Sequence, residues 1–134
     1  MPDDVTIAGN LTVAGTNTSV SSTTITVADP LLELATNNST TDAVDVGLYG
    51  LYDTSGSQDL YGGLFRDASD SGKWKLFKDN QAKPTTTVNV AGTGYAMGTL
   101  VANIEGATVT TTGNILVGGT VDGRDVAADG TKLD

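Results

Sequence analysis

A six-residue pattern recurs in the sequence and limits what the chain can fold into. It reads apolar–x–apolar–(Ala or Gly)–Gly–(Asn or Thr), and it occupies residues 5–10, 11–16, 88–93 and 115–120. Apolar side chains two positions apart point to one face of a strand, and the Gly-Asn or Gly-Thr pair that follows suits a turn. The pattern therefore predicts very short strands separated by corners.

Strands this short are too weakly stabilised to fold as a single chain. Burial of the two apolar side chains in a hexad contributes about 3–6 kcal/mol, whereas ordering six residues costs about 9 kcal/mol. Backbone hydrogen bonds of about 1 kcal/mol each close this gap only if nearly all are formed. A single-chain β-helix would need continuous hexads, and here they occur in ones and twos. We therefore expect identical chains wrapped around one axis as a homotrimer. The candidates for its core are Val5, Ile7, Leu11, Val13, Ile25, Val27, Val88, Val90, Ile115 and Val117.

The composition indicates a mainly β protein with three parts. The sequence has 22 Thr and 17 Gly but only 2 Glu and 5 Lys, which disfavours helix. Six of the seven aromatic residues lie between positions 49 and 77, so the middle of the chain can form an ordinary core. We predict a hexad-repeat fibre segment at 1–28, a central antiparallel β module at 29–84, and a second fibre segment with a linker at 85–134.

Within the central module we expect strands at 29–34, 43–52, 60–66 and 73–78, separated by polar turns and ended by Pro84. They would form a small antiparallel sandwich or sheet. The predicted fold class is thus mainly β and elongated, with intertwined, trimeric β-prism-like or β-helix-like flanks around this module.

Charge and missing residue types exclude several functions. Seven basic residues against 16 acidic ones give a net charge of −9, which argues against nucleic acid and anionic membrane partners. The absence of Cys and His removes disulfides, thiolate catalysis, Ser-His triads and most zinc sites. No apolar run is long enough to insert into a membrane, and the acidic start is unlike a signal peptide.

The abundant Asp residues favour turns over catalysis, because Asp side chains bond nearby backbone N–H groups. Residues 53–59 and 67–72 loosely resemble calcium loops, but neither has the Glu that closes an EF-hand loop. We therefore expect no enzyme activity and no cofactor, with at most a weak Ca²⁺ site.

A group of aromatic residues offers a second kind of site. Trp74, Tyr49 and Tyr61 could form a platform on which sugar rings stack. The competing interpretation, which we favour, is that these scarce large side chains form the core of the module.

Several stretches resemble tail-fibre proteins of marine and cyanobacterial bacteriophages. They are VTIAGNLTVAGTNTSVSSTTITVADPLLEL, DAVDVGLYGLYD, YGGLFRDASDSGKWKLF, PTTTVNVAGTGYAMGTLVANIEG and the linker VDGRDVAADGTKLD. The resemblance implies an elongated homotrimeric structural protein of the virion that takes part in host attachment. It implies contacts with other tail or virion proteins and, through a distal part, with a host surface glycan or protein. The alternatives are a capsid-attached head fibre or decoration protein, and a carbohydrate-binding module for host glycans.

Overall fold

The computed structural model describes residues 5–15, 19–54, 56, 58–106, 108–118 and 120. The chain divides into two compact units, Met1–Met97 and Gly98–Asp134. All strands among the described residues lie in the first unit. The predicted linker at 121–134 and hexad positions 16 and 119 lie outside the described residues. Within the described part, no helix has the length and apolar character needed to cross a bilayer.

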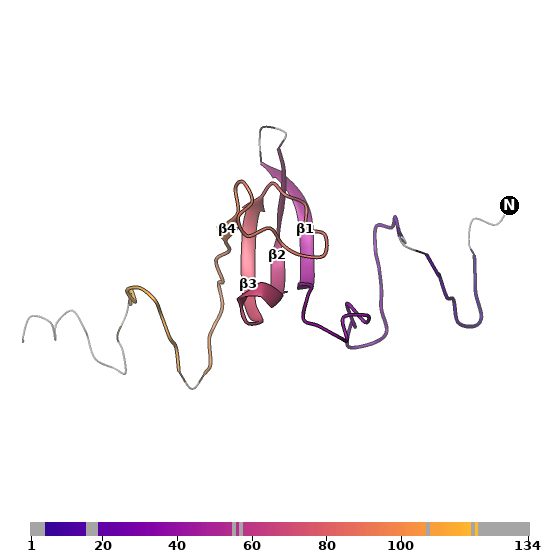
Figure 1. The fold of residues 1–134 in the computed structure, drawn as a ribbon, viewed down its shortest axis with the longest axis horizontal. Coiled ribbons are helices and arrows are strands. Elements are labelled where there is room, and N and C mark those ends of the chain that lie inside the picture. The colour runs from indigo at the N-terminus through magenta and orange to yellow at the C-terminus, as the bar shows by residue number, and fades with distance from the viewer. Residues whose placement is uncertain are drawn as a thin grey trace, which may run out of the picture. The chain divides into compact units, whose positions relative to one another are not determined.

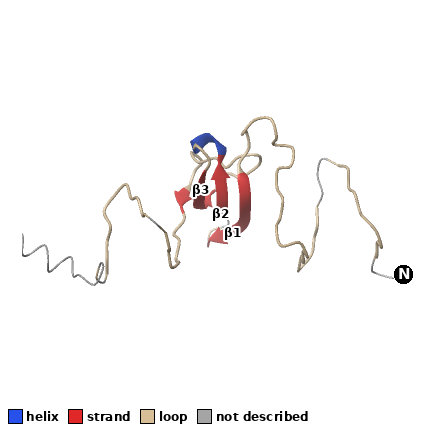
Figure 2. Ribbon diagram, turned by 90° about the horizontal axis from the view of Figure 1, so that it is seen from below, coloured by secondary structure: helices blue, strands red, loops and turns tan. Residues whose placement is uncertain are grey.

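The first unit contains one open antiparallel sheet with strand order β1-β2-β3-β4 (Figure 1). The strands are β1 (Val46–Thr54), β2 (Gln58–Asp67), β3 (Lys73–Asn80) and β4 (Ala96–Met97). A single 3-10 turn, η1 (Ala68–Asp70), joins β2 to β3, and Figure 2 shows it at one end of the strand layer. The prediction of a mainly β chain with an antiparallel module is confirmed, and the module is a sheet rather than a sandwich.

The strand register divides the side chains between two faces. Leu48 is paired with Leu64, which is paired with Leu76, so these three residues lie side by side on one face. Residues one position away alternate to the other face, which carries Phe65 and Phe77. We call the face with Phe65 and Phe77 the covered face, and the face with the three leucines the open face.

The aromatic core lies on the covered face. Tyr61, Phe65 and Phe77 are at most 8% exposed, and the Phe65 and Phe77 rings meet edge to face with centroids 5.4 Å apart. Val88 and Tyr95 pack against this cluster, and the Tyr95 ring stacks on Phe77. Both belong to the segment between β3 and β4, which runs across the sheet and back in Figure 1.

Two expectations about the edges of the module need correction. Residues 29–34 do not form a strand, because the Asp29 side chain accepts the Leu31 N–H in a local turn. At the other end, the sheet extends past residue 84 and takes in β4, so residues 85–97 fold onto the module instead of beginning a separate fibre segment. Val88, a candidate for the oligomer core, accordingly lies against the core of its own chain.

Close contact between β1 and β2 depends on a glycine. A Cβ added at Gly63 would overlap the backbone of Leu48 and Tyr49, whereas one added at Gly50 would meet open space. Gly63 also follows an irregularity in the β2–β3 pairing, and Asp79 opposite has a left-handed φ of 59°. The missing side chain at Gly63 thus lets β1 lie close to β2, next to the point where the register between β2 and β3 shifts.

Candidate functional site

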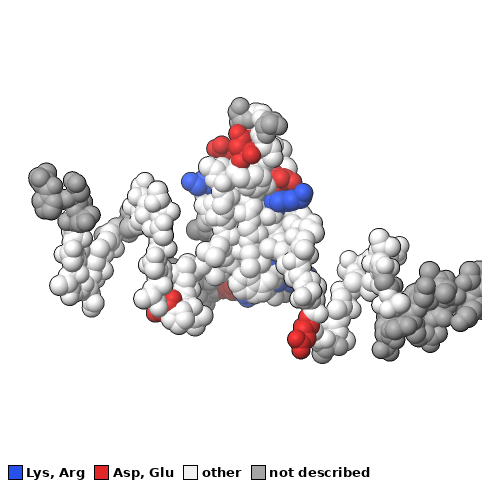
Figure 3. Space-filling view, turned by 180° about the vertical axis from the view of Figure 1, so that it is seen from behind, with Lys and Arg blue, Asp and Glu red and all other residues white. Residues whose placement is uncertain are grey.

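The open face exposes a row of apolar side chains in register. Leu48 is 65% exposed and Leu64 44% exposed, and Leu76 beside them is half-buried. Trp74 lies one row further along β3, opposite Arg66, and is 61% exposed. Figure 3, seen from behind the view of Figure 1, shows a largely uncharged surface on the middle of the module. Contiguous exposed apolar side chains make the open face the candidate interaction site of the module.

The two cations on the open face are neutralised within the chain. Arg66 donates two hydrogen bonds to the Asp42 carboxylate at 2.8 and 2.9 Å, and this ion pair lowers the pKa of Asp42. Lys78 lies 3.3 Å from a carboxylate oxygen of Asp79. The open face is therefore apolar in the middle and bears paired charges at its margins.

Tyr52 fixes one end of the open face. Its ring lies against Gly62, which has no side chain to block it, and its hydroxyl donates to Asp79 Oδ1 at 2.8 Å. The same hydroxyl accepts the Asp79 N–H at 2.7 Å. Burial, together with the neighbouring carboxylate, raises the pKa of Tyr52, while the hydrogen bond from Tyr52 lowers the pKa of Asp79.

The oligomer-core candidates in and between the hexads form a second set of exposed apolar side chains. The described residues of the hexads lie outside strands, and nine of the ten oligomer-core candidates have side chains between 42% and 90% exposed, Val88 being the exception. The nine are Val5, Ile7, Leu11, Val13, Ile25, Val27, Val90, Ile115 and Val117. These side chains have little apolar cover within their own chain.

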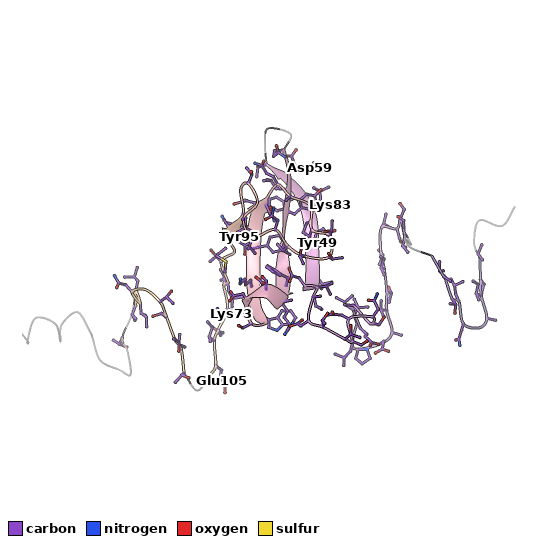
Figure 4. All side chains as sticks on the ribbon, viewed as in Figure 1. Tyr49, Asp59, Lys73, Lys83, Tyr95 and Glu105 are labelled. Atoms are coloured by element: carbon purple, nitrogen blue, oxygen red, sulfur yellow. The ribbon has the colours of Figure 1, made fainter. Side chains whose placement is uncertain are left out.

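The three aromatic residues considered for glycan binding do not form one platform. Tyr61 is 8% exposed and belongs to the core. The Tyr49 and Tyr61 rings meet edge to face with centroids 6.0 Å apart, and the Tyr49 hydroxyl donates to the Pro84 carbonyl at 3.2 Å. Trp74 lies on the opposite face of the sheet. Figure 4 labels Tyr49 and Tyr95 over the sheet, both on the covered side.

The loop at 67–72 uses its carboxylates within the protein. Asp67 is 2% exposed; it accepts from the backbone of Ser69 and Asp70 and from Lys75 Nζ at 2.7 Å. Lys75 also forms an ion pair with Asp70, and Lys73 Nζ donates a hydrogen bond to the Asp70 carboxylate. These two ammonium groups lower the pKa of Asp70 to about 2. Lys75 and the Ser69 hydroxyl lower the pKa of Asp67, whose carboxylate in turn raises the pKa of Lys75. The carboxylates of this loop are thus paired with lysine side chains.

The second acidic loop, at 53–59, lies at the far end of the β1–β2 hairpin. Asp53 and Asp59 are cross-strand neighbours there, and Figure 3 shows acidic side chains gathered at this end. Residues 55 and 57 of this loop lie outside the described part. Among the described residues, no group of three His, Cys, Asp or Glu side chains could hold a metal ion.

A hollow of about 410 Å³ opens beside the start of β1. The two carboxylates that line it are engaged: Asp42 pairs with Arg66, and Asp45 accepts the N–H groups of Ala68 and Val88. The hollow thus offers hydroxyl and backbone groups, with its acids held by other residues.

Comparison with known proteins adds no support to the resemblance between stretches of this sequence and tail-fibre proteins. The chain matches no protein-family model, and neither a curated protein nor a solved structure matches it.

The open face is the site that sequence reasoning missed. Alternation in the sequence predicts that Val44, Val46, Leu48 and Tyr52 share one face of a strand, but it does not indicate which face the segment after β3 covers.

Proposed function

We propose that this protein is a non-enzymatic structural component of a bacteriophage virion, the trimeric stalk or spacer segment of a tail fibre. One observation carries the proposal: the apolar side chains of the hexads are exposed in the single chain, from 42% for Val90 and Val117 to 90% for Val5. Monomeric proteins rarely leave so many apolar side chains uncovered.

Partner copies are the simplest cover for these side chains. Full burial of one Val, Leu or Ile contributes about 1.5–3 kcal/mol. Burial of nine such side chains in each of three chains, together with backbone hydrogen bonds between the chains, has to offset both the ordering of the hexads and an association cost of about 4–15 kcal/mol for each step. A closed rotational symmetry gives every copy the same environment and leaves no apolar stripe uncovered.

The phage assignment is supported by the stretches that resemble tail-fibre proteins, above all GLFRDAS and the KLF that follows. In the structure these stretches form β2, η1 and β3, the best-packed part of the module. In this proposal the role is mechanical: interlocked chains form a stiff spacer that holds a distal adhesin away from the particle.

Molar mass in solution tests the assembly. We expect light scattering during gel filtration to give about three times the chain mass of 13.6 kDa. The double variant Ile7→Asp and Val13→Asp should weaken assembly, because it places charge on the apolar face of two hexads. Thr6→Asp and Thr12→Asp, at the alternate positions of the same hexads, form the matched control. A stable 13.6 kDa species at micromolar concentration would contradict the proposal.

The location on the particle needs a separate experiment. An antibody raised against the chain should label tail fibres in electron micrographs of the phage that encodes it. Labelling confined to the capsid would instead support the head-fibre or decoration alternative.

One observation favours carbohydrate binding as a second candidate function: Trp74 is 61% exposed. A solvated indole can stack on a sugar ring. Binding to host surface glycans that is lost in Trp74→Ala, with the far-UV circular dichroism unchanged, would support this candidate. Equal binding by both proteins would exclude Trp74 as the contact.

A further inference from the structure

We propose that the open face is an interface between copies of this chain: three sheets pack around the axis with Leu48, Leu64 and Leu76 facing inward. Each open face would thus pack against the open faces of the other two copies. This inference rests on the trimer of the proposed function and adds which surface of the central module faces the axis.

Strand topology fits this arrangement. The strands are adjacent in chain order, so the chain enters the sheet at β1 and leaves it at β4, on opposite edges. With strands about 4.8 Å apart, the chain advances about 14 Å from the first edge to the last. Strands lying across the axis would let each copy pass through the module in the direction of the fibre. The row of three leucines would then run along that axis.

The middle of the other face is covered by the chain itself. Val88 and Tyr95 cover the aromatic core, and the Pro84 carbonyl accepts the Tyr49 hydroxyl. The segment that contributes these contacts belongs to the same chain. The open face is thus the side of the sheet whose apolar row is available for a contact between sheets.

The charges on the open face permit its burial against identical copies. Arg66 and Lys78 each have a carboxylate partner within the chain, so packing would bring no unpaired cation into the interface. The acidic pair Asp53 and Asp59 lies at the far end of the hairpin, beyond the leucine row. Identical chains with a net charge of −9 repel one another overall, so the attraction must come from the apolar row.

The size of the apolar row also favours a second copy over a free partner. Stable complexes of separate proteins bury about 800 Å² on each partner, and three leucines with one tryptophan fall short of that. Copies joined through their hexads would instead meet at an effective concentration in the millimolar range. A surface this small is sufficient at that concentration.

Chemical cross-linking tests the inference, because the chain has no cysteine and a single introduced thiol reacts alone. Leu48 and Leu51 form a matched pair: they lie on β1, are 65% and 61% exposed, and point to opposite faces. We would treat the full-length Leu48→Cys and Leu51→Cys proteins with a short bis-maleimide and follow covalent dimers on denaturing gels. Leu48→Cys should cross-link on the order of tenfold faster.

The molar mass of each variant, measured before cross-linking, separates the possible outcomes. A trimer in which Leu48→Cys cross-links selectively supports the inference. A trimer in which both variants cross-link equally, or in which Leu51→Cys is faster, overturns the inference and leaves the trimer standing. A monomer overturns the proposed function and the inference together.

Trp74 provides a second measurement that needs no cysteine, because it is the sole tryptophan. It lies on the open face, so assembly should shift its emission to shorter wavelength and slow its quenching by acrylamide. Leu64→Asp should reverse both changes, whereas Leu51→Asp should leave them in place. A trimer whose Trp74 is quenched as fast as free tryptophan would contradict the inference.

Discussion

Asp45 joins three segments of the module, and its removal provides a test of how the covered face is closed. Its carboxylate accepts the Val88 N–H at 2.7 Å and the Ala68 N–H at 3.0 Å. Asp45→Ala leaves both half-buried donors without that acceptor, at about 1–3 kcal/mol each. Val88 also loses its anchor against the core. We expect a loss of about 2–4 kcal/mol in the free energy of unfolding.

Urea unfolding followed by far-UV circular dichroism measures this loss. At equal protein concentration, which matters for the proposed oligomer, the midpoint should fall by at least about 0.7 M, given a slope of about 1–3 kcal/mol/M. Asp45→Asn keeps one acceptor oxygen and should lose less. Asp59→Ala, on the exposed hairpin end, serves as the control and should change stability by less than about 0.5 kcal/mol. If Asp45→Ala behaves like that control, Asp45 does not hold the segment after β3 in place.

Three further predictions concern the sheet. Gly63→Ala should destabilise the module by about 1–3 kcal/mol, because the added methyl overlaps the backbone of β1. Gly50→Ala meets open space and should be neutral or slightly stabilising, as urea midpoints would show. The pKa values of Asp67 and Asp70 are lowered from 3.8, so their stabilisation is complete above about pH 4 and is lost as the pH falls toward 2. Thermal melts between pH 5 and 2 should show that fall, and Asp67→Asn should flatten it. Tyr52→Phe removes a hydroxyl that makes two hydrogen bonds and should cost about 1–2 kcal/mol in the same urea assay.

The local parts of the sheet could be predicted from the sequence. Alternating apolar residues and turn-forming clusters placed strands at 43–52, 60–66 and 73–78, and the structure has strands at Val46–Thr54, Gln58–Asp67 and Lys73–Asn80. These strands are joined by short turns, and their pairing follows from neighbouring sequence. A hairpin needs no information from distant residues.

The closure of the covered face could not be predicted in the same way. It depends on the bond between Asp45 and the Val88 N–H, which joins residues 43 positions apart. The hexad at 88–93 has the same pattern as the hexads of the fibre segments, so local sequence assigns both to one class. Val88 packs within its own chain because the aromatic cluster of Tyr61, Phe65 and Phe77 lies next to it.

The same reasoning explains why the candidate site was only partly visible in the sequence. Apolar spacing led us to expect that ten side chains form the core of an oligomer, and nine of these ten are exposed in the single chain. The scarcity of large side chains suggested that Trp74, Tyr49 and Tyr61 form one core. The register separates them, since Trp74 is paired with Arg66 on the open face while Tyr61 is buried on the other.

The two kinds of surface suggest different roles within one assembly. Hexads are short, similar to one another and rich in glycine, so chains paired through them alone could slip in register. The module has a defined register of its own, with Leu48, Leu64 and Leu76 at fixed heights across the sheet. Its strands are local in sequence and pack around aromatic residues, so it can form before the hexads pair. Three modules that meet through their open faces would align the chains and thereby set the register of the hexads on either side. In this arrangement the module supplies the alignment and the hexads supply most of the buried apolar surface.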